Sequence, residues 1–114
     1  MTNKGTDIPV MTPVRTFGDL VFTSGSATST GDTPSQIRYC LEQLRGRLEA
    51  AGASLETVVK ATVYLTEMSD RERYLNEIWR EYFPTNPPCR TTVQVALGPN
   101  TKVEIEMIAH RIRA

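Results

Sequence analysis

The chain has 114 residues, and its 13 lysines and arginines balance 13 aspartates and glutamates, so the formal net charge is zero. This length predicts a single domain over residues 1–114. A neutral chain lacks the net positive charge that attracts nucleic acids and anionic membranes. Two cysteines and one histidine disfavour a zinc or iron–sulfur site, which needs three or four such ligands, so we expect no metal.

The first predicted elements are a β-hairpin and a long helix. Residues 13–17 and 20–24 flank the turn signal GD and predict two paired strands. Pro34 marks a first helical residue with Thr33 as its cap, and Gly52 ends this helix in a left-handed conformation. The apolar stripe of the helix, at helical spacing, consists of Ile37, Cys40, Leu41, Leu44 and Leu48.

A strand and a second helix follow. Residues 59–65 alternate between apolar and polar side chains, which predicts a strand with its odd-numbered residues toward a core. Ser69 and Glu72 form a capping-box signature for a helix that Pro84 ends. The apolar stripe of this helix consists of Tyr74, Leu75, Ile78, Trp79, Tyr82 and Phe83.

The last elements are two strands, residues 89–97 and 102–112, on either side of a Gly-Pro-Asn turn. The predicted order is β-β-α-β-α-β-β, an α+β fold with a mixed sheet and both helices packed on one sheet face. The odd-numbered residues suit the covered face: Val59, Val63, Val93, Val95, Val103 and Ile105. The even-numbered face is too mixed for a core and too weakly charged for solvent, so we expect it to meet another subunit: Thr62, Tyr64, Arg90, Thr92, Gln94, Ala96, Glu104 and Ile108.

A hairpin between the last two strands, centred on Pro99, sets an expected register. It places Arg90 near Ile108 and Glu104 near Gln94. The two charged residues are then about four positions apart along the sheet, or ~14 Å at ~3.4 Å per residue. One small ligand could not easily touch both within one chain, so a shared site needs Arg90 from one subunit and Glu104 from a neighbour.

Arg90 and Glu104 are the main candidates for chemistry. The stiff Pro-Pro-Cys lead-in places Arg90 at a strand start, where its guanidinium fork could bind a carboxylate; the alternative is a solvated rim arginine with a surface salt bridge. Glu104 and Glu106 lie on one strand face. A half-buried glutamate there could activate a water as a general base, and the alternative is a polar strand edge.

Four further residues could bear on a site: Cys89, Cys40, His110 and Asn76. Cys89 beside Arg90 could be a nucleophile, but no histidine pattern activates it, so we favour a packed structural thiol. Cys40 lies on an apolar helix stripe and His110 near the end of the last strand, so we expect a buried thiol and a surface imidazole. Asn76 is either a polar residue on a helix face or a ligand contact.

The N-terminus predicts no targeting segment. The stretch MTNKGTDIPV has no apolar core of signal-peptide length, and no later stretch approaches a membrane span. We therefore expect a cytoplasmic protein whose cysteines are reduced thiols. Residues 1–10 carry few structural signals, and we expect them to be flexible.

Four stretches together resemble the Rid family (reactive intermediate deaminases, also called YjgF-type or L-PSP endoribonuclease proteins). They are GDLVFTSG, LEAAGASLETVVKATVYLTEM, YLNEIWREYF and, most specific, PPCRTTVQVALGPNTKVEIEMIA. The resemblance implies a chorismate-mutase-like fold assembled as a homotrimer, with sites in the clefts between subunits. It also implies cofactor-free hydrolysis of enamines and imines, such as 2-aminoacrylate and 2-iminopropanoate, to 2-oxo acids and ammonia.

The resemblance also assigns roles by position. Arg90 matches the arginine that binds the substrate carboxylate, and Glu104 the glutamate that positions the attacking water. Thr92 matches the residue whose backbone holds the imine end, Gly25 the glycine of the first cleft loop, and Asn76 the second-helix asparagine. Ser26 stands where the family's S-G-Q has glutamine, and we expect it to line the cleft as a substrate-binding residue.

One departure keeps alternatives open. Active family members usually carry a tyrosine in a G-P-Y-S-Q-like segment before the first strand, where this chain reads MTPVRTFG. This difference is compatible with a bulkier substrate, a pathway-specific role, or a pocket that binds without turnover. The alternatives to an imine hydrolase are a non-catalytic small-carboxylate-binding or interaction module and, disfavoured by the neutral charge, a ribonuclease.

Overall fold

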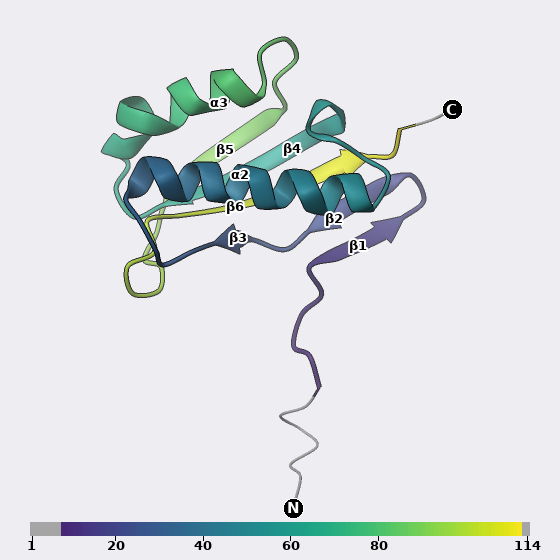
Figure 1. Ribbon diagram of the computed structural model, residues 1–114, viewed down its shortest axis with the longest axis horizontal. Helices are drawn as coiled ribbons and strands as arrows, with labels where there is room; N and C mark the ends of the chain where they lie inside the picture. The colour runs from purple at the N-terminus through teal and green to yellow at the C-terminus, as the bar shows by residue number, and fades with distance from the viewer. Residues whose placement is uncertain (1–7, 113–114) are drawn as a thin grey trace, which may run out of the picture.

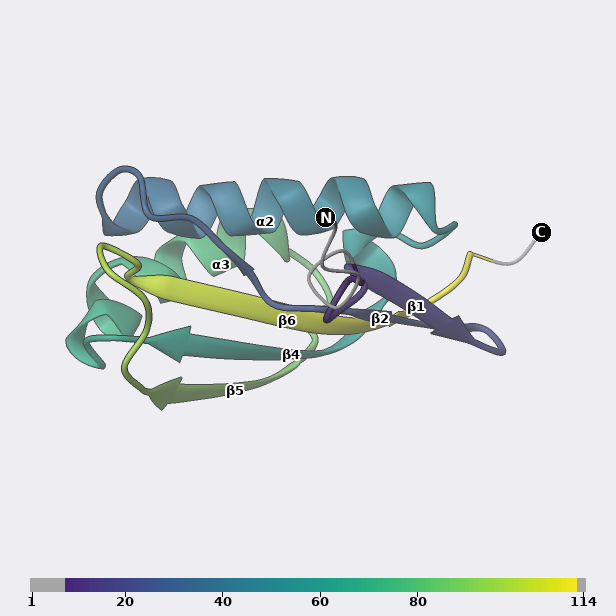
Figure 2. The same ribbon diagram turned by 90° about the horizontal axis from the view of Figure 1, so that it is seen from below.

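Both helices lie on one face of a mixed β-sheet, and the other face is left open (Figures 1 and 2). The structure, a computed structural model, describes residues 8–112, and within them the sheet has six strands in the order β1-β2-β6-β4-β5, with β3 also paired to β6. The predicted fold class and element order are confirmed, and the structure adds the short strand β3. The elements are β1 (Val14–Phe17), β2 (Leu20–Thr23), β3 (Ser26–Ala27), α2 (Thr33–Ala50), η1 (Leu55–Thr57), β4 (Val58–Leu65), η2 (Arg71–Leu75), α3 (Asn76–Tyr82), β5 (Cys89–Gln94) and β6 (Val103–His110).

The N-terminal hairpin forms as predicted. β1 pairs antiparallel with β2 across a turn at Gly18, whose φ of 58° lies in the left-handed region that glycine favours. From residue 8 onward, the chain before β1 extends away from the sheet (Figure 1) until Thr12 and Pro13, whose carbonyls accept hydrogen bonds from Ser24. Of the segment 1–10 that we expected to be flexible, residues 1–7 lie outside the described residues.

Helix α2 buries the predicted stripe completely, because every one of its five apolar side chains is inaccessible to solvent. Its N-terminal cap is one residue earlier than predicted. The Asp32 carboxylate, not Thr33, accepts a hydrogen bond from the Ser35 N–H at 3.0 Å, so Pro34 is the second helical residue. Gly52 follows the helix with φ 86°, which confirms the predicted left-handed end.

The second helical segment begins differently from the prediction. The helical residues begin at Ser69 and Asp70, continue as the π-helical turn η2 and pass directly into α3. Ser69 is itself helical, and neither Ser69 nor Glu72 makes a side-chain hydrogen bond to the backbone within residues 8–112, so the expected capping box does not cap this helix. The predicted end is confirmed, because α3 stops at Tyr82, two residues before Pro84.

The predicted hairpin between the last two strands is wrong. β4 lies between β5 and β6, parallel to β5 and antiparallel to β6. The reason is the connection through η2 and α3, because a helical crossover returns the chain parallel to the strand it left. Arg90 therefore pairs with Ala61 rather than Ile108, and Glu104 pairs with Tyr64 rather than Gln94.

The start of β4 also differs in phase from the prediction. The register shifts between Val58 and Lys60, as in a β-bulge. Val58 is consequently buried at 5% exposure, whereas Val59, which we assigned to the core, is 45% exposed. The alternation resumes as predicted from Ala61 onward.

Strand β5 presents the opposite face to the one predicted. Arg90 pairs with Ala61 and Thr92 with Val63, and both partners are fully buried beneath the helices. Because paired residues of neighbouring strands point to the same side, Arg90 and Thr92 face the helices. The open face is instead formed by the residues Arg15, Phe17, Leu20, Phe22, Lys60, Thr62, Tyr64, Cys89, Thr91, Val93, Glu104, Glu106, Ile108 and His110.

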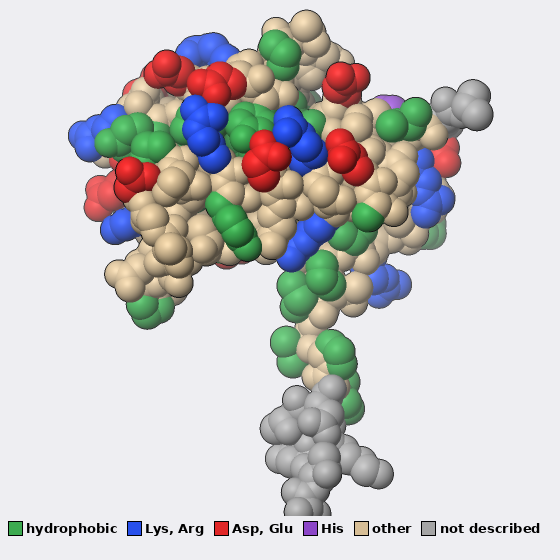
Figure 3. Space-filling model, viewed as in Figure 1, with side chains coloured by type: hydrophobic (Ala, Val, Ile, Leu, Met, Phe, Trp, Pro, Cys, Tyr) green, Lys and Arg blue, Asp and Glu red, His purple; other side chains and the backbone are tan. Residues whose placement is uncertain are grey.

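The two sheet faces have different surroundings. On the helix side, charged side chains of both signs gather over the helices (Figure 3), as expected for a surface in water. On the open face, Phe17 is 79% exposed, and Leu20 and Phe22 are each 37% exposed. Within residues 8–112, no helix is long and apolar enough to cross a membrane.

Candidate active site

Arg90 is held by two side chains of α3. Its guanidinium carbon lies 5.2 Å from the centroid of the Trp79 ring, and its Nη2 donates a hydrogen bond of 2.7 Å to Asn76 Oδ1. Trp79 is 5% exposed, so the ring is a fixed platform. Asn76 thus positions Arg90. This role differs from both interpretations of the sequence, a polar residue on a helix face and a ligand contact. Thr92 follows on the same side of β5.

The electrostatics of Arg90 favour an anionic ligand. Burial lowers the pKa of Arg90, the positive charge of Arg71 lowers it further, and Glu72 opposes this effect. Among the ion pairs of residues 8–112, none involves Arg90, and its side-chain partner Asn76 is neutral. This arrangement differs from a solvated rim arginine in a surface salt bridge. A guanidinium that is partly desolvated and lacks a carboxylate partner can bind one from a ligand.

Glu104 forms a second cluster with Gly25. The Gly25 backbone lies so close to the Glu104 side chain that a Cβ at position 25 would come within 2.7 Å of Cδ. Only glycine leaves room for this approach. Glu104 is partly exposed on β6, between its strand partners Ala27 and Tyr64.

Glu104 and Glu106 share the open face but have different partners. Glu106 Oε1 accepts a hydrogen bond of 2.9 Å from the Tyr64 hydroxyl, and this bond raises the pKa of Tyr64. No side-chain hydrogen bond of Glu104 occurs among the described residues. Glu104 is therefore the carboxylate available to a water or a ligand.

Ser26 does not present its side chain to a cleft. It is 1% exposed, and its Oγ donates a 2.6 Å hydrogen bond to Gln43 Oε1 on α2. The alternation of a strand explains this placement, because Ser26 pairs with buried Ile105 whereas Ala27 pairs with Glu104. Ser26 can therefore meet a ligand only through its backbone.

The cysteines and the histidine divide between core and surface. Cys40 is fully buried as predicted, and burial raises its thiol pKa to about 12. Cys89 is exposed on the open face, so the prediction of a packed structural thiol is wrong. The inverted phase of β5 is the reason, because it turns Cys89 away from the helices. His110 is exposed, as predicted.

The Arg90 and Glu104 clusters lie on opposite faces of the sheet. Arg90 pairs with Ala61 beneath the helices, whereas Glu104 pairs with Tyr64 on the open face, three positions further along β4. The expected separation within one chain therefore holds, but for a different reason from the predicted hairpin register. One small ligand cannot contact both side chains of the same chain.

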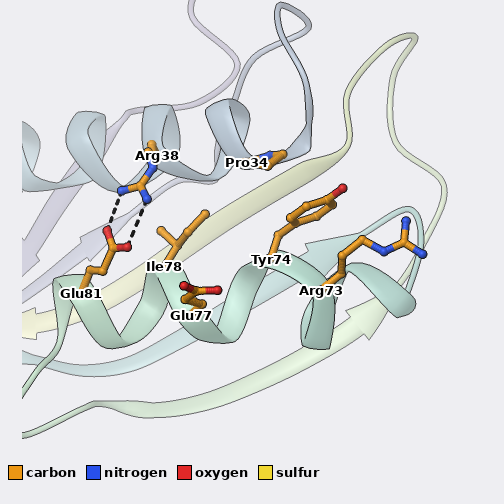
Figure 4. Close-up of a pocket in the computed structure, with 7 residues that line it drawn as sticks. All are labelled: Pro34, Arg38, Arg73, Tyr74, Glu77, Ile78 and Glu81. Carbon is orange, nitrogen blue, oxygen red and sulfur yellow. Dashed lines mark hydrogen bonds and ion pairs between the residues drawn. The ribbon is translucent and has the colours of Figure 1, made fainter.

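A cleft between α2 and α3 is separate from both clusters. It has a volume of about 210 Å³, and Figure 4 shows Arg38 and Glu81 paired across it, at 2.8 and 3.2 Å. The remaining lining residues are Pro34, Arg73, Tyr74, Glu77 and Ile78. Arg38 and Glu81 satisfy each other, and the other arginine of the lining, Arg73, is exposed to solvent, unlike the partly desolvated Arg90.

Trp79 and Arg71 are the parts of this site that sequence reasoning missed. Trp79 belongs to an apolar stripe, where burial is the simplest expectation. Trp79 lies three residues after Asn76, so both side chains lie on one helix face. This spacing was the signal in the sequence that Trp79 lies next to Asn76. Arg71 carried no signal, because only the π-helical turn determines which way it faces.

The sequence and the fold match known proteins. Residues 11–111 match the family model described as Endoribonuclease L-PSP. The RutC family protein PH0854 of Pyrococcus horikoshii is 44% identical over 82 residues, covering 71% of this chain and 64% of that protein, which is less than two thirds of its length. TdcF of Escherichia coli K12, whose name describes a reactive intermediate deaminase, is 37% identical over 106 residues, covering 83% and 81%.

Solved structures agree. RidA from an Antarctic Psychrobacter species has a TM-score of 0.84 at 32% identity, covering 90% of this chain and 89% of that one. NMB1025 of Neisseria meningitidis, a YjgF family member, has a TM-score of 0.87 at 27% identity, covering 94% and 92%. The fold is therefore that of the YjgF-type domains. The chain belongs to the Endoribonuclease L-PSP family, the group that includes the Rid proteins.

Proposed function

We propose that this protein hydrolyses the reactive imines and enamines of amino acids to 2-oxo acids and ammonia, without a cofactor. The observation that carries this proposal is the Arg90 cluster, a guanidinium stacked on Trp79, anchored by Asn76 and without a carboxylate partner. A 2-imino acid has the carboxylate that such a cluster binds. The name of the relative TdcF supports the same reaction class.

In the proposed mechanism, the ligand carboxylate binds to Arg90, which orients the imine carbon. Glu104 accepts a proton from a water molecule as the water oxygen adds to that carbon. The addition to the protonated imine gives a neutral carbinolamine. Glu104 returns its proton to the carbinolamine nitrogen and then takes the hydroxyl proton, so that ammonia leaves and the carbonyl of the 2-oxo acid forms. The backbone at Thr92 holds the imine end, and Gly25 leaves the space in which the Glu104 carboxylate lies.

The proposed site is completed between chains of a homotrimer. Arg90 and Glu104 lie on opposite faces of one sheet, so a shared ligand needs Arg90 of one chain and Glu104 of its neighbour. The exposed apolar side chains of the open face, Phe17, Leu20 and Phe22, fit a surface that a second copy covers. Light scattering should show a trimer, and Phe22→Asp should shift it toward monomer. A stable wild-type monomer would overturn the assembly.

Turnover is the deciding measurement. An L-amino-acid oxidase generates the imine in the presence of semicarbazide, and an active protein lowers the yield of semicarbazone. Arg90→Ala and Glu104→Gln should abolish this effect, whereas Arg80→Ala, which removes an exposed arginine of α3, should leave it unchanged. Absence of an effect across a panel of amino acids would contradict the proposed reaction.

A non-catalytic carboxylate-binding module is the second candidate. The absence of tyrosine from the segment MTPVRTFG favours it, because the Arg90 cluster is retained while another wall of the cleft differs. Binding of 2-oxobutanoate without turnover of any imine would support this candidate.

A ribonuclease is the third candidate, and the description of the matching family model is its support. The net charge of zero disfavours it. RNA cleavage that persists after replacement of both Arg90 and Glu104 would indicate contamination.

A further inference from the structure

A second arginine lies at the Arg90 cluster. Arg71 is the first residue of the π-helical turn η2, and its carbonyl accepts a hydrogen bond from the N–H of Asn76, five residues later. This bond places Arg71 one turn before Asn76 on the same side of the helical segment. The Asn76 side chain in turn accepts a hydrogen bond of 2.7 Å from Arg90, so Arg71 lies one helical turn from the residue that holds Arg90.

Electrostatics agree with this placement. After burial, the charge of Arg71 is the next largest contribution to the lowered pKa of Arg90. Two cations at one edge, with a single nearby carboxylate on Glu72, leave a local excess of positive charge. That excess is unexpected for a site that binds one monocarboxylate, which Arg90 alone could hold.

The ion pair that Arg71 forms with Glu72 is weak. Its Nε lies 3.4 Å from Glu72 Oε1, and the two side chains are 45% and 73% exposed. An adjacent exposed pair of this kind contributes little and uses one edge of the guanidinium. The terminal nitrogens of Arg71 can therefore bind a ligand carboxylate without breaking a buried interaction.

We propose that Arg71 is a specificity-determining residue that gives the site a preference for 2-imino dicarboxylic acids, the imines of acidic amino acids. Arg90 binds the carboxylate next to the imine carbon, and Arg71 binds the carboxylate of the side chain. The reaction adds water across the imine bond and releases ammonia, leaving a 2-oxo dicarboxylic acid. This inference rests on the proposed function for its substrate class, but its test does not require turnover.

Calorimetry with product analogues tests the inference directly. We compare the affinity for 2-oxoglutarate with that for 2-oxobutanoate in the wild type, Arg71→Gln and Arg73→Gln. The wild type should prefer the dicarboxylate, and Arg71→Gln should weaken its binding about fivefold, the upper range for an exposed ion pair, while leaving 2-oxobutanoate unchanged. The preference should also diminish at high salt, because exposed charges are screened.

Arg73→Gln is the matched control. Arg73 is an exposed arginine of the same turn, but its guanidinium lies 5.9 Å from the ring centroid of Tyr74, and it lines the separate cleft in Figure 4. It should leave both affinities unchanged. Circular dichroism confirms that each variant retains its fold.

The outcomes distinguish the inference from the proposed function. A wild type without preference, or an Arg71→Gln variant that weakens both ligands equally, would overturn the inference, even if imines are hydrolysed. A preference that disappears only in Arg71→Gln supports it, even if no imine is turned over. With turnover, Arg71→Gln should raise KM for the imines of acidic amino acids, whereas Arg73→Gln should leave this KM unchanged.

Discussion

Gly25→Ala separates the chemistry of the candidate site from the stability of the fold. A Cβ at position 25 would lie 2.7 Å from Cδ and 2.9 Å from Cγ of Glu104, whereas ordinary contacts begin at 3.4 Å. The Glu104 carboxyl carbon must therefore move by about 0.7 Å or more. A misplacement approaching ~1 Å can cost about 100-fold in rate, so we expect kcat to fall by about 10- to 100-fold.

Stability should change little in this variant. Gly25 is not among the residues with positive φ, so alanine can adopt its backbone conformation. The displaced group is the end of a partly exposed side chain, and we expect the free energy of unfolding to stay within about 1 kcal/mol of the wild-type value. Gly98→Ala is the matched control, because its added Cβ would meet nothing closer than Thr101 Oγ1 at 3.8 Å.

Imine hydrolysis and urea unfolding are measured in parallel for Gly25→Ala, Gly98→Ala and Glu104→Gln. Adding Gly25→Ala to Glu104→Gln should cause no further loss of rate, because both changes act on the same carboxylate. A Gly25→Ala variant with wild-type kcat, or one whose effect is undiminished without the Glu104 carboxylate, would refute the reasoning.

Three further predictions concern other parts of the chain. Burial raises the pKa of the Cys40 thiol in the folded protein to about 12, against 9.0 for a free thiol. Because the unfolded chain loses this proton at lower pH than the folded protein does, the free energy of unfolding should fall as the pH rises from 9.0 to about 12. Cys40→Ala should show a smaller alkaline loss in urea unfolding, and an identical loss would contradict the burial argument. Val58→Thr should cost about 1–2 kcal/mol and Val59→Thr less than about 0.5 kcal/mol, and equal costs would argue against the bulge. Asn76→Ala should raise the calorimetric Kd for 2-oxobutanoate about three- to tenfold by loosening Arg90, and an unchanged Kd would remove its positioning role.

Local pattern and local chemistry made α2 predictable. Its five apolar residues recur at helical spacing, so one face had to be buried, and Gly52 supplied the conformation that ends the helix. The error at its start was one residue, because Asp32 and Thr33 both have side chains that can cap a helix, and only the chain geometry selects between them.

Strand pairing could not be predicted in the same way. Two adjacent strands joined by a Gly-Pro-Asn loop pair in many proteins, yet here β4 lies between β5 and β6. Pairing depends on the path of the crossover through α3, which involves residues far apart in the sequence. The exchange of faces at Arg90 and Cys89 follows from that pairing, as does the exposure of Cys89.

The sequence alone determined the neutral composition, the types of the elements and the candidates Arg90 and Glu104. These features depend only on residue identity and on neighbours within a few positions of the chain. Only the tertiary structure decided how those candidates are grouped. It placed Arg90 on Trp79 beneath the helices and Glu104 against Gly25, with its side chain toward the open face. The physical reason is that a side chain's face is set by strand register and helix phase, which are properties of the packed sheet and not of any local segment.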